Sequence, residues 1–371
     1  MILKKISLKN FRNYDNLELD FNKKINIFIG NNAQGKTNIL ESIYVLAITK
    51  SHRTNKEIYL LKNNSLFTKI SGIIEEENKT TNYEVLINNN GKRVSINNNS
   101  LKKVSDYLSN INAIMFCPDD LEIIKGSPLN RRTFLNLEIS SLNNNYLKLL
   151  SNYNKILKSR NEYLKSNSSI DKSYFDILTD KLIDLNIHIY MERKKFINLL
   201  NKYIKNIYFN ISGSDSIEIK YDSFIDYEDE DEEMMKYMLR DKYDKVFNLE
   251  LLNQVTMLGI HKDDFSIYID NNKINNYGSQ GQHRTAIFCL KLAEIEIYKN
   301  ELNKKPILLL DDIFSELDKN KKNNIIKYID NDLQVFITST DLSNIDKKII
   351  KNADIFTVDN GKVAIGDQNG R

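Results

Sequence analysis

The amino-acid sequence predicts an α/β fold in which the two ends of the chain form one head domain and a mainly helical lobe is inserted between them. Apolar and polar residues alternate over residues 1–30, which is the pattern of β-strands. Residues 128–207 have a largely helical pattern instead, and strands and helices return from residue 258. We therefore expect a discontinuous head of residues 1–125 and 258–371, with the inserted lobe over residues 126–257.

The individual elements follow from the same pattern in chain order. Turn residues separate short apolar segments, as expected for strands, while apolar residues spaced three to four apart mark the helices. Two antiparallel arms of ~40 residues in the helical region would each reach at most ~60 Å, which excludes a long coiled coil. The predicted elements are strands near residues 6–8, 17–21 and 25–29, a helix from Asn38, strands within 68–97 that turn at 88–91, a helix from Pro128, a helix after Gln282, strands at 307–310 and 335–338, a helix near Ile325, and a terminal hairpin that turns at 360–361.

Composition excludes several classes of protein. Hydrophobic residues make up 41% and charged residues 28% of the chain, as in ordinary globular proteins and unlike disordered ones. Cys117 and Cys289 lie far apart and form no CxxC pair, so neither a disulfide framework nor a zinc site is indicated. No segment approaches the ~18 apolar residues of a membrane span, and no apolar signal segment opens the chain, so we expect a cytoplasmic protein with no membrane partner.

Charged residues are clustered along the chain, although the net charge is only +3. That net charge does not by itself indicate nucleic-acid binding, but local basic clusters are candidates for phosphate contacts. An acidic run over 226–233 would repel DNA and is predicted to be an exposed loop. The basic clusters are Lys4, Lys5, Lys9 and Arg12; Lys50, His52, Arg53 and Lys56; Lys92, Arg93, Lys102 and Lys103; and Arg131 with Arg132.

The strongest motif is a phosphate-binding loop between the predicted strand at 25–29 and the predicted helix that follows. Its glycines allow a tight turn, so that backbone N–H groups and the helix N-terminus point at the β-phosphate of ATP. As a catalytic residue, Lys36 is expected to reach the β- and γ-phosphates, and Thr37 is expected to place its hydroxyl on Mg²⁺. The loop consists of Gly30, Asn31, Asn32, Ala33, Gln34, Gly35, Lys36 and Thr37.

Two carboxylates follow the four apolar residues at 307–310, which indicate a strand buried on both faces of a parallel sheet. Because α/β proteins bind ligands at the carboxyl edge of such sheets, Asp311 and Asp312 are candidates for catalytic residues. Asp311 fits a Mg²⁺ ligand, and Asp312 fits the residue that polarises the attacking water. A strand that simply ends in polar residues is the alternative, and the phosphate loop favours the catalytic interpretation.

A second phosphate contact is predicted where Ser279, Gln280, Gly281 and Gln282 open a helix upstream of the Asp311 strand. Ser279, Gly281 and Gln282 are candidates for binding ATP, since a hydroxyl and a glycine at a helix N-terminus suit a phosphate; a plain helix cap is the alternative. Acidic residues at 315–318 and polar ones at 338–341 complete the motif order of an ABC-type P-loop ATPase. In such enzymes this signature closes over the ATP of another subunit, so the order predicts an ATP-dependent homodimer.

Together these segments resemble the RecF family of bacterial recombinational-repair ATPases, related to the SMC proteins. The resemblance covers nearly the whole chain and is weakest over about 140–255. One departure is Ile260 with Lys262 before Asp263 and Asp264, where the family has proline and arginine; lysine keeps the charge but loses the bidentate fork. The matching segments are 9–14, 30–41, 51–54, 118–122, 125–128, 131–132, 279–284, 291–294 and 310–318.

The resemblance implies a two-lobed head that dimerises with ATP and binds DNA across the dimer, on gapped DNA or at single-strand/double-strand junctions. It implies work with RecO and RecR to load RecA, and support of replication restart and the SOS response. Slow hydrolysis is expected because Asp312 is one methylene shorter than the glutamate of most ABC-type ATPases. The alternatives are the ATP-binding cassette of a membrane transporter, which the long insertion disfavours, and a small-molecule P-loop kinase, which the signature disfavours.

Overall fold

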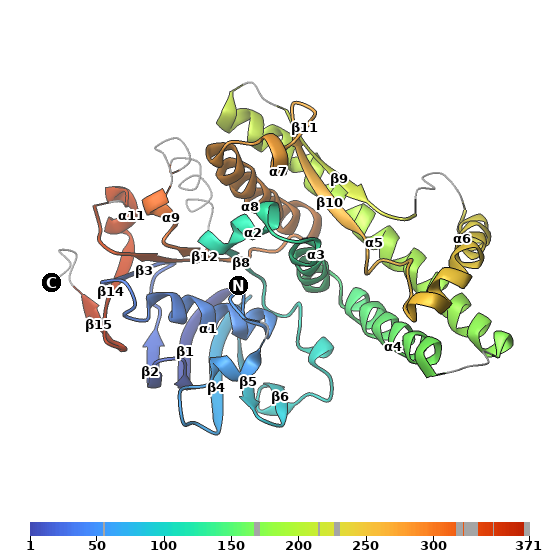
Figure 1. The fold of residues 1–371 in the computed structure, drawn as a ribbon. Coiled ribbons are helices and arrows are strands. Elements are labelled where there is room, and N and C mark those ends of the chain that lie inside the picture. Colours follow the sequence, from blue (N-terminus) through green and yellow to red (C-terminus); the bar gives the residue numbers. More distant parts are fainter. Residues whose placement is uncertain are drawn as a thin grey trace. The chain divides into compact units, whose positions relative to one another are not determined.

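The structure, a computed structural model, describes residues 1–54, 56–166, 171–213, 216–225, 231–316, 322, 333–343 and 345–366. The chain divides into two compact units. Unit 1 comprises residues 1–121, 207–214 and 284–371, and unit 2 comprises residues 122–206 and 215–283. Two of the helices drawn in Figure 1, α5 (Lys172–Ser212) and α8 (Gln280–Leu302), have residues assigned to each of the two units.

A six-stranded sheet in unit 1 carries the candidate site. Its strand order is β15-β14-β3-β13-β12-β8, and all neighbours are parallel except the terminal hairpin of β14 and β15. Every residue of β12 and β13 is buried, as expected for central strands covered on both faces. The strands are β3 (Ile25–Ile29), β8 (Ala113–Phe116), β12 (Ile307–Asp311), β13 (Val335–Ser339), β14 (Ala353–Asp359) and β15 (Lys362–Gly366).

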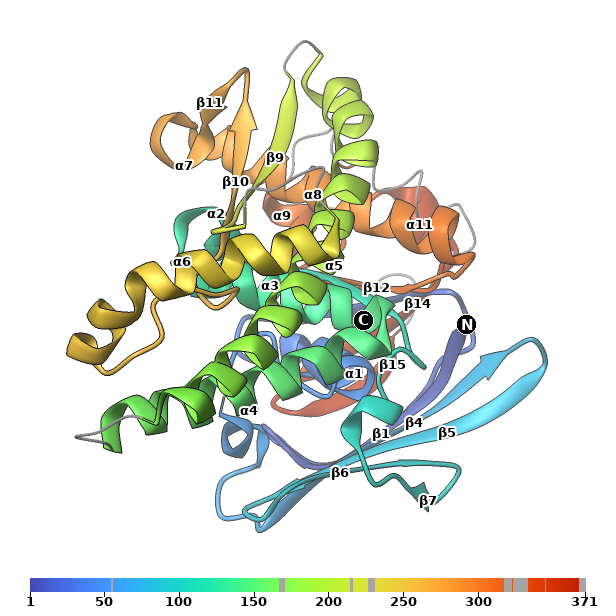
Figure 2. The same ribbon diagram turned by 90° about the vertical axis from the view of Figure 1, so that its right-hand side faces the viewer.

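The second sheet of unit 1 is antiparallel, in the order β2-β1-β4-β5-β6-β7 (Figure 2). Its strands alternate buried and more exposed residues, as expected for a sheet with one face on the core. Helix α1 (Lys36–Ile48) contacts strands of both sheets, which explains why its apolar residues are buried. The strands are β1 (Ile2–Phe11), β2 (Tyr14–Asp20), β4 (Phe67–Glu76), β5 (Lys79–Asn88), β6 (Gly91–Ile96) and β7 (Asn99–Ser100).

Unit 2 is mainly helical and includes a three-stranded antiparallel sheet in the order β11-β10-β9. Helices α4 and α5 are antiparallel. Tyr146, near the start of α4, bonds to Arg193 in the middle of α5, whereas Arg160, toward the end of α4, bonds to Thr179 near the start of α5. The elements are α2 (Glu122–Lys125), α3 (Pro128–Leu142), α4 (Asn144–Ser166), α6 (Glu232–Asn253), α7 (Ile274–Tyr277), β9 (Ile217–Asp222), β10 (Asp264–Ile269) and β11 (Asn272–Lys273).

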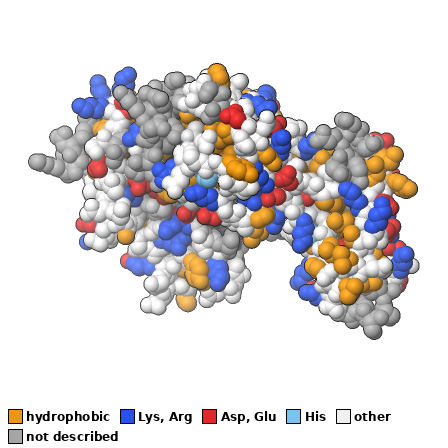
Figure 3. All heavy atoms as spheres, turned by 45° about the horizontal axis from the view of Figure 1, so that its top comes forward, with side chains coloured by type: hydrophobic (Ala, Val, Ile, Leu, Met, Phe, Trp, Pro, Cys, Tyr) orange, Lys and Arg blue, Asp and Glu red, His pale blue; other side chains and the backbone are white. Residues whose placement is uncertain are grey.

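The surface over α4, α5 and α6 mixes exposed hydrophobic side chains with lysine and arginine, on the right of Figure 3. None of the helices in the described ranges is long and apolar enough to cross a membrane. Exposed apolar residues on α5 and α6 include Tyr174, Ile177, Tyr237, Leu249 and Leu252.

The α/β class and the helical insertion are confirmed by these elements, and two details differ from the sequence prediction. The predicted boundary at 257/258 differs from the division in the structure, because β10 pairs with β9 along its whole length and so belongs to unit 2. The acidic run is not a loop throughout: Asp231 caps α6, and Glu232 and Glu233 form its first turn. Residues 226–230 and the helix predicted near Ile325 lie outside the described residues.

Candidate nucleotide-binding site

The phosphate loop lies between β3 and α1, as the sequence predicts, and its glycines occupy positions that exclude a larger residue. Gly30 and Gly35 have φ angles of 153° and 113°, in the region that favours glycine. A Cβ atom on Gly30 would lie 2.2 Å from the Val358 carbonyl oxygen. A Cβ atom on Gly35 would lie 2.6 Å from Asn13 Nδ2 and 2.7 Å from Tyr14 Oη. Close packing against β14 and the β1–β2 turn therefore requires both glycines.

Lys36 folds back over this loop from the first turn of α1. Its Nζ donates to the carbonyl oxygens of Gly30 (2.5 Å) and Asn31 (2.8 Å). Burial lowers the pKa of Lys36, and the charges of Asp312 and Asp311 oppose that shift. The ammonium group is thus held in a poorly solvated position over the loop, where an anionic ligand would replace lost hydration.

Thr37 and Asp311 come together although 274 residues separate them. The Thr37 hydroxyl donates to Asp311 Oδ1 at 2.9 Å, and the Thr338 hydroxyl donates to the same oxygen at 2.7 Å. Parallel pairing of β12, β13 and β3 brings these residues to one edge of the sheet, because it aligns the carboxyl ends of the strands. Burial raises the pKa of Asp311, and hydrogen bonds from Thr338 and Thr37 act in the opposite direction.

This pair of oxygen ligands fits Mg²⁺. Mg²⁺ prefers one or two protein oxygens together with water and substrate phosphates, and it does not need an all-protein cage. Among the residues that the structure describes, no group of three or more His, Cys, Asp or Glu side chains is arranged to hold a metal ion. A hydroxyl and a carboxylate beside a phosphate loop therefore suit Mg²⁺ bound together with a nucleotide.

Asp312 has an unusual backbone conformation directly after β12. Its φ angle is 51°, in the left-handed region that residues other than glycine seldom adopt. Its backbone N–H donates to the Thr338 hydroxyl at 2.9 Å, so β13 holds this conformation in place. Left-handed residues of this kind are concentrated at functional sites.

Hydrogen bonds from distant segments hold the phosphate loop, and sequence reasoning missed them. Gln34 Oε1 accepts from the backbone N–H of Asn360 (2.5 Å), and the Gln34 carbonyl accepts from the Gly361 N–H (3.2 Å). Asn13 donates to the same carbonyl (3.3 Å) and accepts from Asn38 (2.8 Å). The β14–β15 turn was predicted from its Asn-Gly pair, but no local signal placed it beside the loop.

Arg12 and Glu41, from two of the segments that resemble the RecF family, form an ion pair that is largely shielded from solvent. The guanidinium group donates twice to the carboxylate, at 2.6 and 2.8 Å, and the Glu41 side chain is fully buried. Ser51 also donates to Glu41, at 2.5 Å, and Arg53 donates to Asn38 at 3.1 Å. Arg12 therefore supports the fold. Of its predicted basic cluster, only the lysines Lys4, Lys5 and Lys9 are left as candidates for phosphate contacts.

The predicted signature residues lie at the N-terminus of α8, in unit 2. Ser279 and Gln282 form a reciprocal cap: the Ser279 hydroxyl accepts from the Gln282 N–H (3.2 Å), and Gln282 Oε1 accepts from the Ser279 N–H (2.8 Å). A Cβ on Gly281 would meet nothing closer than the Ser279 hydroxyl, at 3.8 Å. Ser279 and Gln282 thus form the helix cap that was the alternative interpretation of this segment. The exposed Gly281 also leaves room for a ligand at the end of the helix.

Arg131 is a structural residue and is unsuited to DNA contact. It donates through two nitrogens to Asp264, at 2.6 and 2.9 Å, and its side chain is 7% exposed. Asp263 accepts from Tyr221 and Ser223 and pairs with Arg193 at 3.7 Å. Asp263 and Asp264, which lie in the segment that differs from the RecF family pattern, therefore hold side chains of unit 2 together.

His261, in the same segment, is a packed histidine. Its Nδ1 lies 2.6 Å from Tyr153 Oη, and burial lowers its pKa to about 4. An imidazole with this pKa is neutral near pH 7, which suits a residue of the unit 2 interior.

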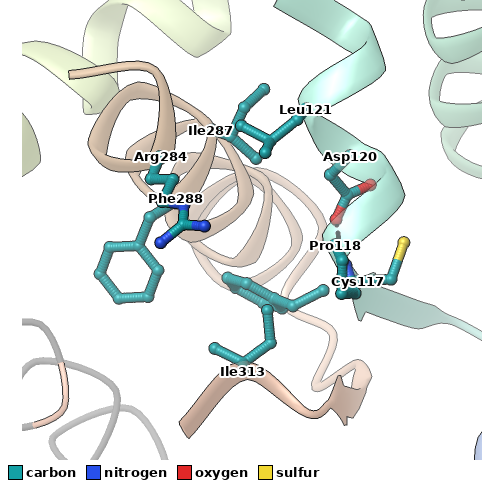
Figure 4. A pocket seen from close by; sticks show the side chains of 9 residues that line it. Cys117, Pro118, Asp120, Leu121, Arg284, Ile287, Phe288 and Ile313 are labelled. Carbon is teal, nitrogen blue, oxygen red and sulfur yellow. Dashed lines mark hydrogen bonds between the residues drawn. The ribbon is translucent and has the colours of Figure 1, made fainter. Parts of the chain in front are cut away.

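A pocket opens beside the site, at the carboxyl ends of β8 and β12 (Figure 4). Ile313, which follows Asp312 directly, forms part of its wall, and no residue of the phosphate loop does. Its lining is mainly apolar, with Asp120 and Arg284 as charged members. The Asp120 carboxylate accepts a hydrogen bond from the Cys117 N–H at 2.8 Å, so two residues of the pocket wall are bonded to each other.

Comparison with known proteins identifies the family. Residues 2–364 match the model of the RecF/RecN/SMC N terminal domain. The "DNA replication and repair protein RecF" of Listeria monocytogenes serotype 4b (strain CLIP80459) is 39% identical over 98% of this chain and 99% of its own length. The protein of the same name from Bacillus subtilis (strain 168) is 37% identical over 97% and 99%.

Solved structures agree with this assignment. A structure described as the recombination mediator protein RecF-ATP in the RecFOR pathway has a TM-score of 0.92 and 33% identity, over 98% of this chain and 97% of that one. An Smc head domain from Pyrococcus furiosus, with a TM-score of 0.53 and 14% identity, shares the fold alone. The chain therefore belongs to the RecF family.

Proposed function

We propose that this chain is an ATP-dependent DNA-binding protein of recombinational repair and replication restart. Its two copies would close on gapped or junction DNA when ATP binds, and slow hydrolysis would release them. Membership of the RecF family supports this, as do relatives named for DNA replication and repair. The observation that best supports ATP hydrolysis is the hydrogen bond between Thr37 and Asp311 beside the phosphate loop.

Each site residue has a role in this proposal. Backbone N–H groups of residues 30–37 would bind the phosphates, and Lys36 would exchange its loop carbonyl partners for phosphate oxygens. Thr37 and Asp311 would hold Mg²⁺, which neutralises phosphate charge when bound. Asp312 would orient the attacking water and accept its proton. Ser279, Gly281 and Gln282 of a second copy would complete the site.

RecO, RecR and RecA are the further partners in this proposal, through which the chain would support recombinase loading and the SOS response. A solved relative is described as part of the RecFOR pathway. The alternative of a transporter cassette has no observation in its favour, since the relatives are named for DNA replication and repair.

Asp312→Asn is expected to form a stable dimer with ATP and to hold gapped DNA more firmly than the wild type. The amide cannot accept a proton, so hydrolysis slows while ATP still binds. Size-exclusion chromatography with light scattering, with and without ATP, measures the dimer, and wild-type turnover should lie below the typical enzyme median of about 10 s⁻¹. A variant that stays monomeric in every nucleotide and DNA condition would contradict the proposal.

Gly281→Ala is expected to abolish ATP-dependent dimerisation without lowering stability. The new methyl group meets no atom closer than 3.8 Å, and alanine suits a helix better than glycine by ~1 kcal/mol. It would nevertheless occupy the space through which a phosphate of the second copy approaches the helix end. Light scattering with ATP measures dimerisation, and thermal unfolding provides the stability control. Normal dimerisation of this variant would remove the second phosphate contact from the proposal.

A further inference from the structure

A turn of unit 1 displays an aromatic ring on the protein surface. The 3₁₀ helix η1 (Glu57–Leu60) buries Leu60 completely, whereas Ile58 and Tyr59 are 45% and 55% exposed. The Arg12 guanidinium donates to the Tyr59 carbonyl at 2.8 Å, and the Arg12 N–H donates to the Leu60 carbonyl at 2.9 Å. The turn is therefore anchored on its inner side to Arg12, the residue directly after β1, and its outer side is held in place facing solvent.

Basic side chains lie against the aromatic rings of this region. Lys56 Nζ is 5.6 Å from the centre of the Tyr59 ring, and Lys9 Nζ is 5.7 Å from the centre of the Phe67 ring. Thr68 donates to the Lys9 carbonyl, and the Lys62 N–H donates to the Asn10 carbonyl, so the end of β1 joins the two groups.

The acidic residues of the same region already have basic partners. Glu57 pairs with Lys92, Asp15 pairs with Lys62, and Glu41 pairs with Arg12. Over the described part of the chain, Lys9 and Lys56 form no ion pair. The surface therefore presents uncompensated positive charge next to exposed aromatic and apolar groups.

We propose that this surface, formed by Lys9, Lys56, Ile58, Tyr59 and Phe67, binds single-stranded DNA. Tyr59 would stack on an unpaired base, and Lys56 and Lys9 would contact the flanking phosphates. Proteins that bind single strands combine these two chemistries, since each base has a π-face and each nucleotide a phosphate. A duplex contacts cations through its phosphates but offers no free base face to an aromatic ring. The inference rests on the proposed function and adds a site for the single-stranded side of a junction.

Tyr59→Ala is expected to weaken binding of a single-stranded oligothymidine about tenfold, as for the loss of one stacked base, and to leave blunt-duplex binding unchanged. Tyr59→Phe keeps the ring and should bind as the wild type does. Tyr237→Ala removes a tyrosine that is 74% exposed on α6 and serves as the matched control. Lys56→Gln should reduce the salt dependence of single-strand binding by about 0.7 in slope, the contribution of one phosphate. Fluorescence anisotropy of labelled DNA with the full chain and ATP measures all four variants.

Other outcomes of these measurements would overturn the inference. Equal losses on single-stranded and duplex DNA would assign Tyr59 a role in the fold instead. Unchanged single-strand affinity in Tyr59→Ala, with normal duplex binding, would leave this surface to another partner, such as a protein, and leave the proposed function intact. Failure of the wild type to bind any DNA would instead refute the proposed function, and this inference with it.

Discussion

Gly35→Ala is expected to weaken ATP binding by about two orders of magnitude or more, equivalent to ~3 kcal/mol. The added Cβ would lie 2.6 Å from Asn13 Nδ2 and 2.7 Å from Tyr14 Oη, closer than real atoms approach. Tyr14 is 1% exposed and donates to the Gly35 carbonyl at 3.1 Å, so its ring cannot move away. The loop backbone must shift instead, and the N–H groups that would bind phosphate move with it. Isothermal titration with ATP and Mg²⁺ measures the effect.

Gly91→Ala provides a matched control for this loss. Gly91 has nearly the same φ angle, 114° against 113° for Gly35, but a Cβ atom there would meet nothing within 4 Å. The control therefore carries the backbone strain, ~1 kcal/mol or more, without the clash. We expect Gly91→Ala to bind ATP as the wild type does. Similar ATP affinity in Gly35→Ala and Gly91→Ala would show that the contacts with Asn13 and Tyr14 do not control the loop.

Arg160→Ala is expected to destabilise unit 2 by ~3–5 kcal/mol, since it leaves the Glu250 carboxylate buried without its partner. Both side chains are completely buried, and their nitrogen and oxygen lie 2.6 Å apart. Arg160 also donates to Thr256 (2.8 Å) and Thr179 (3.2 Å), so one guanidinium group joins α4, α5 and the segment after α6. Urea unfolding followed by circular dichroism measures the free energy of unfolding.

Two further variants distinguish the stability lost with the buried ion pair from the stability lost when any arginine is replaced. Arg240→Ala removes a guanidinium group from the partly exposed aspartates Asp176 and Asp180, and we expect a loss of ~1 kcal/mol or less. The double variant Arg160→Met with Glu250→Leu removes both buried charges and should recover part of the stability lost in Arg160→Ala. A loss of under ~1 kcal/mol in Arg160→Ala would mean that water reaches Glu250 and that the pair contributes little.

The sequence by itself determined the features that depend on neighbouring residues. The strand, glycine loop and helix at residues 25–48 are local, because backbone preference and apolar spacing operate over a few residues. The same holds for the buried strand that ends at Asp311 and for the Asn-Gly turn at 360–361. A fully apolar strand also indicated a parallel sheet, from which the edge that carries Asp311 followed.

Tertiary structure alone decided other contacts between distant residues. The motifs predicted that Thr37 and Asp311 share one Mg²⁺ and therefore meet, but only the packing of the β14–β15 turn brought Asn360 to Gln34. Charge clustering has the same limit: Arg131 is a candidate for a phosphate contact only because it belongs to a basic cluster, and in the structure it pairs with Asp264 within unit 2. Pairing across hundreds of residues depends on which surfaces pack together, and no local preference encodes that choice. The boundary of unit 2 lies near residue 283 because β10 pairs with β9 and so belongs to that unit. Alternation of apolar residues predicts that a segment is a strand, but it does not predict which other strand pairs with it.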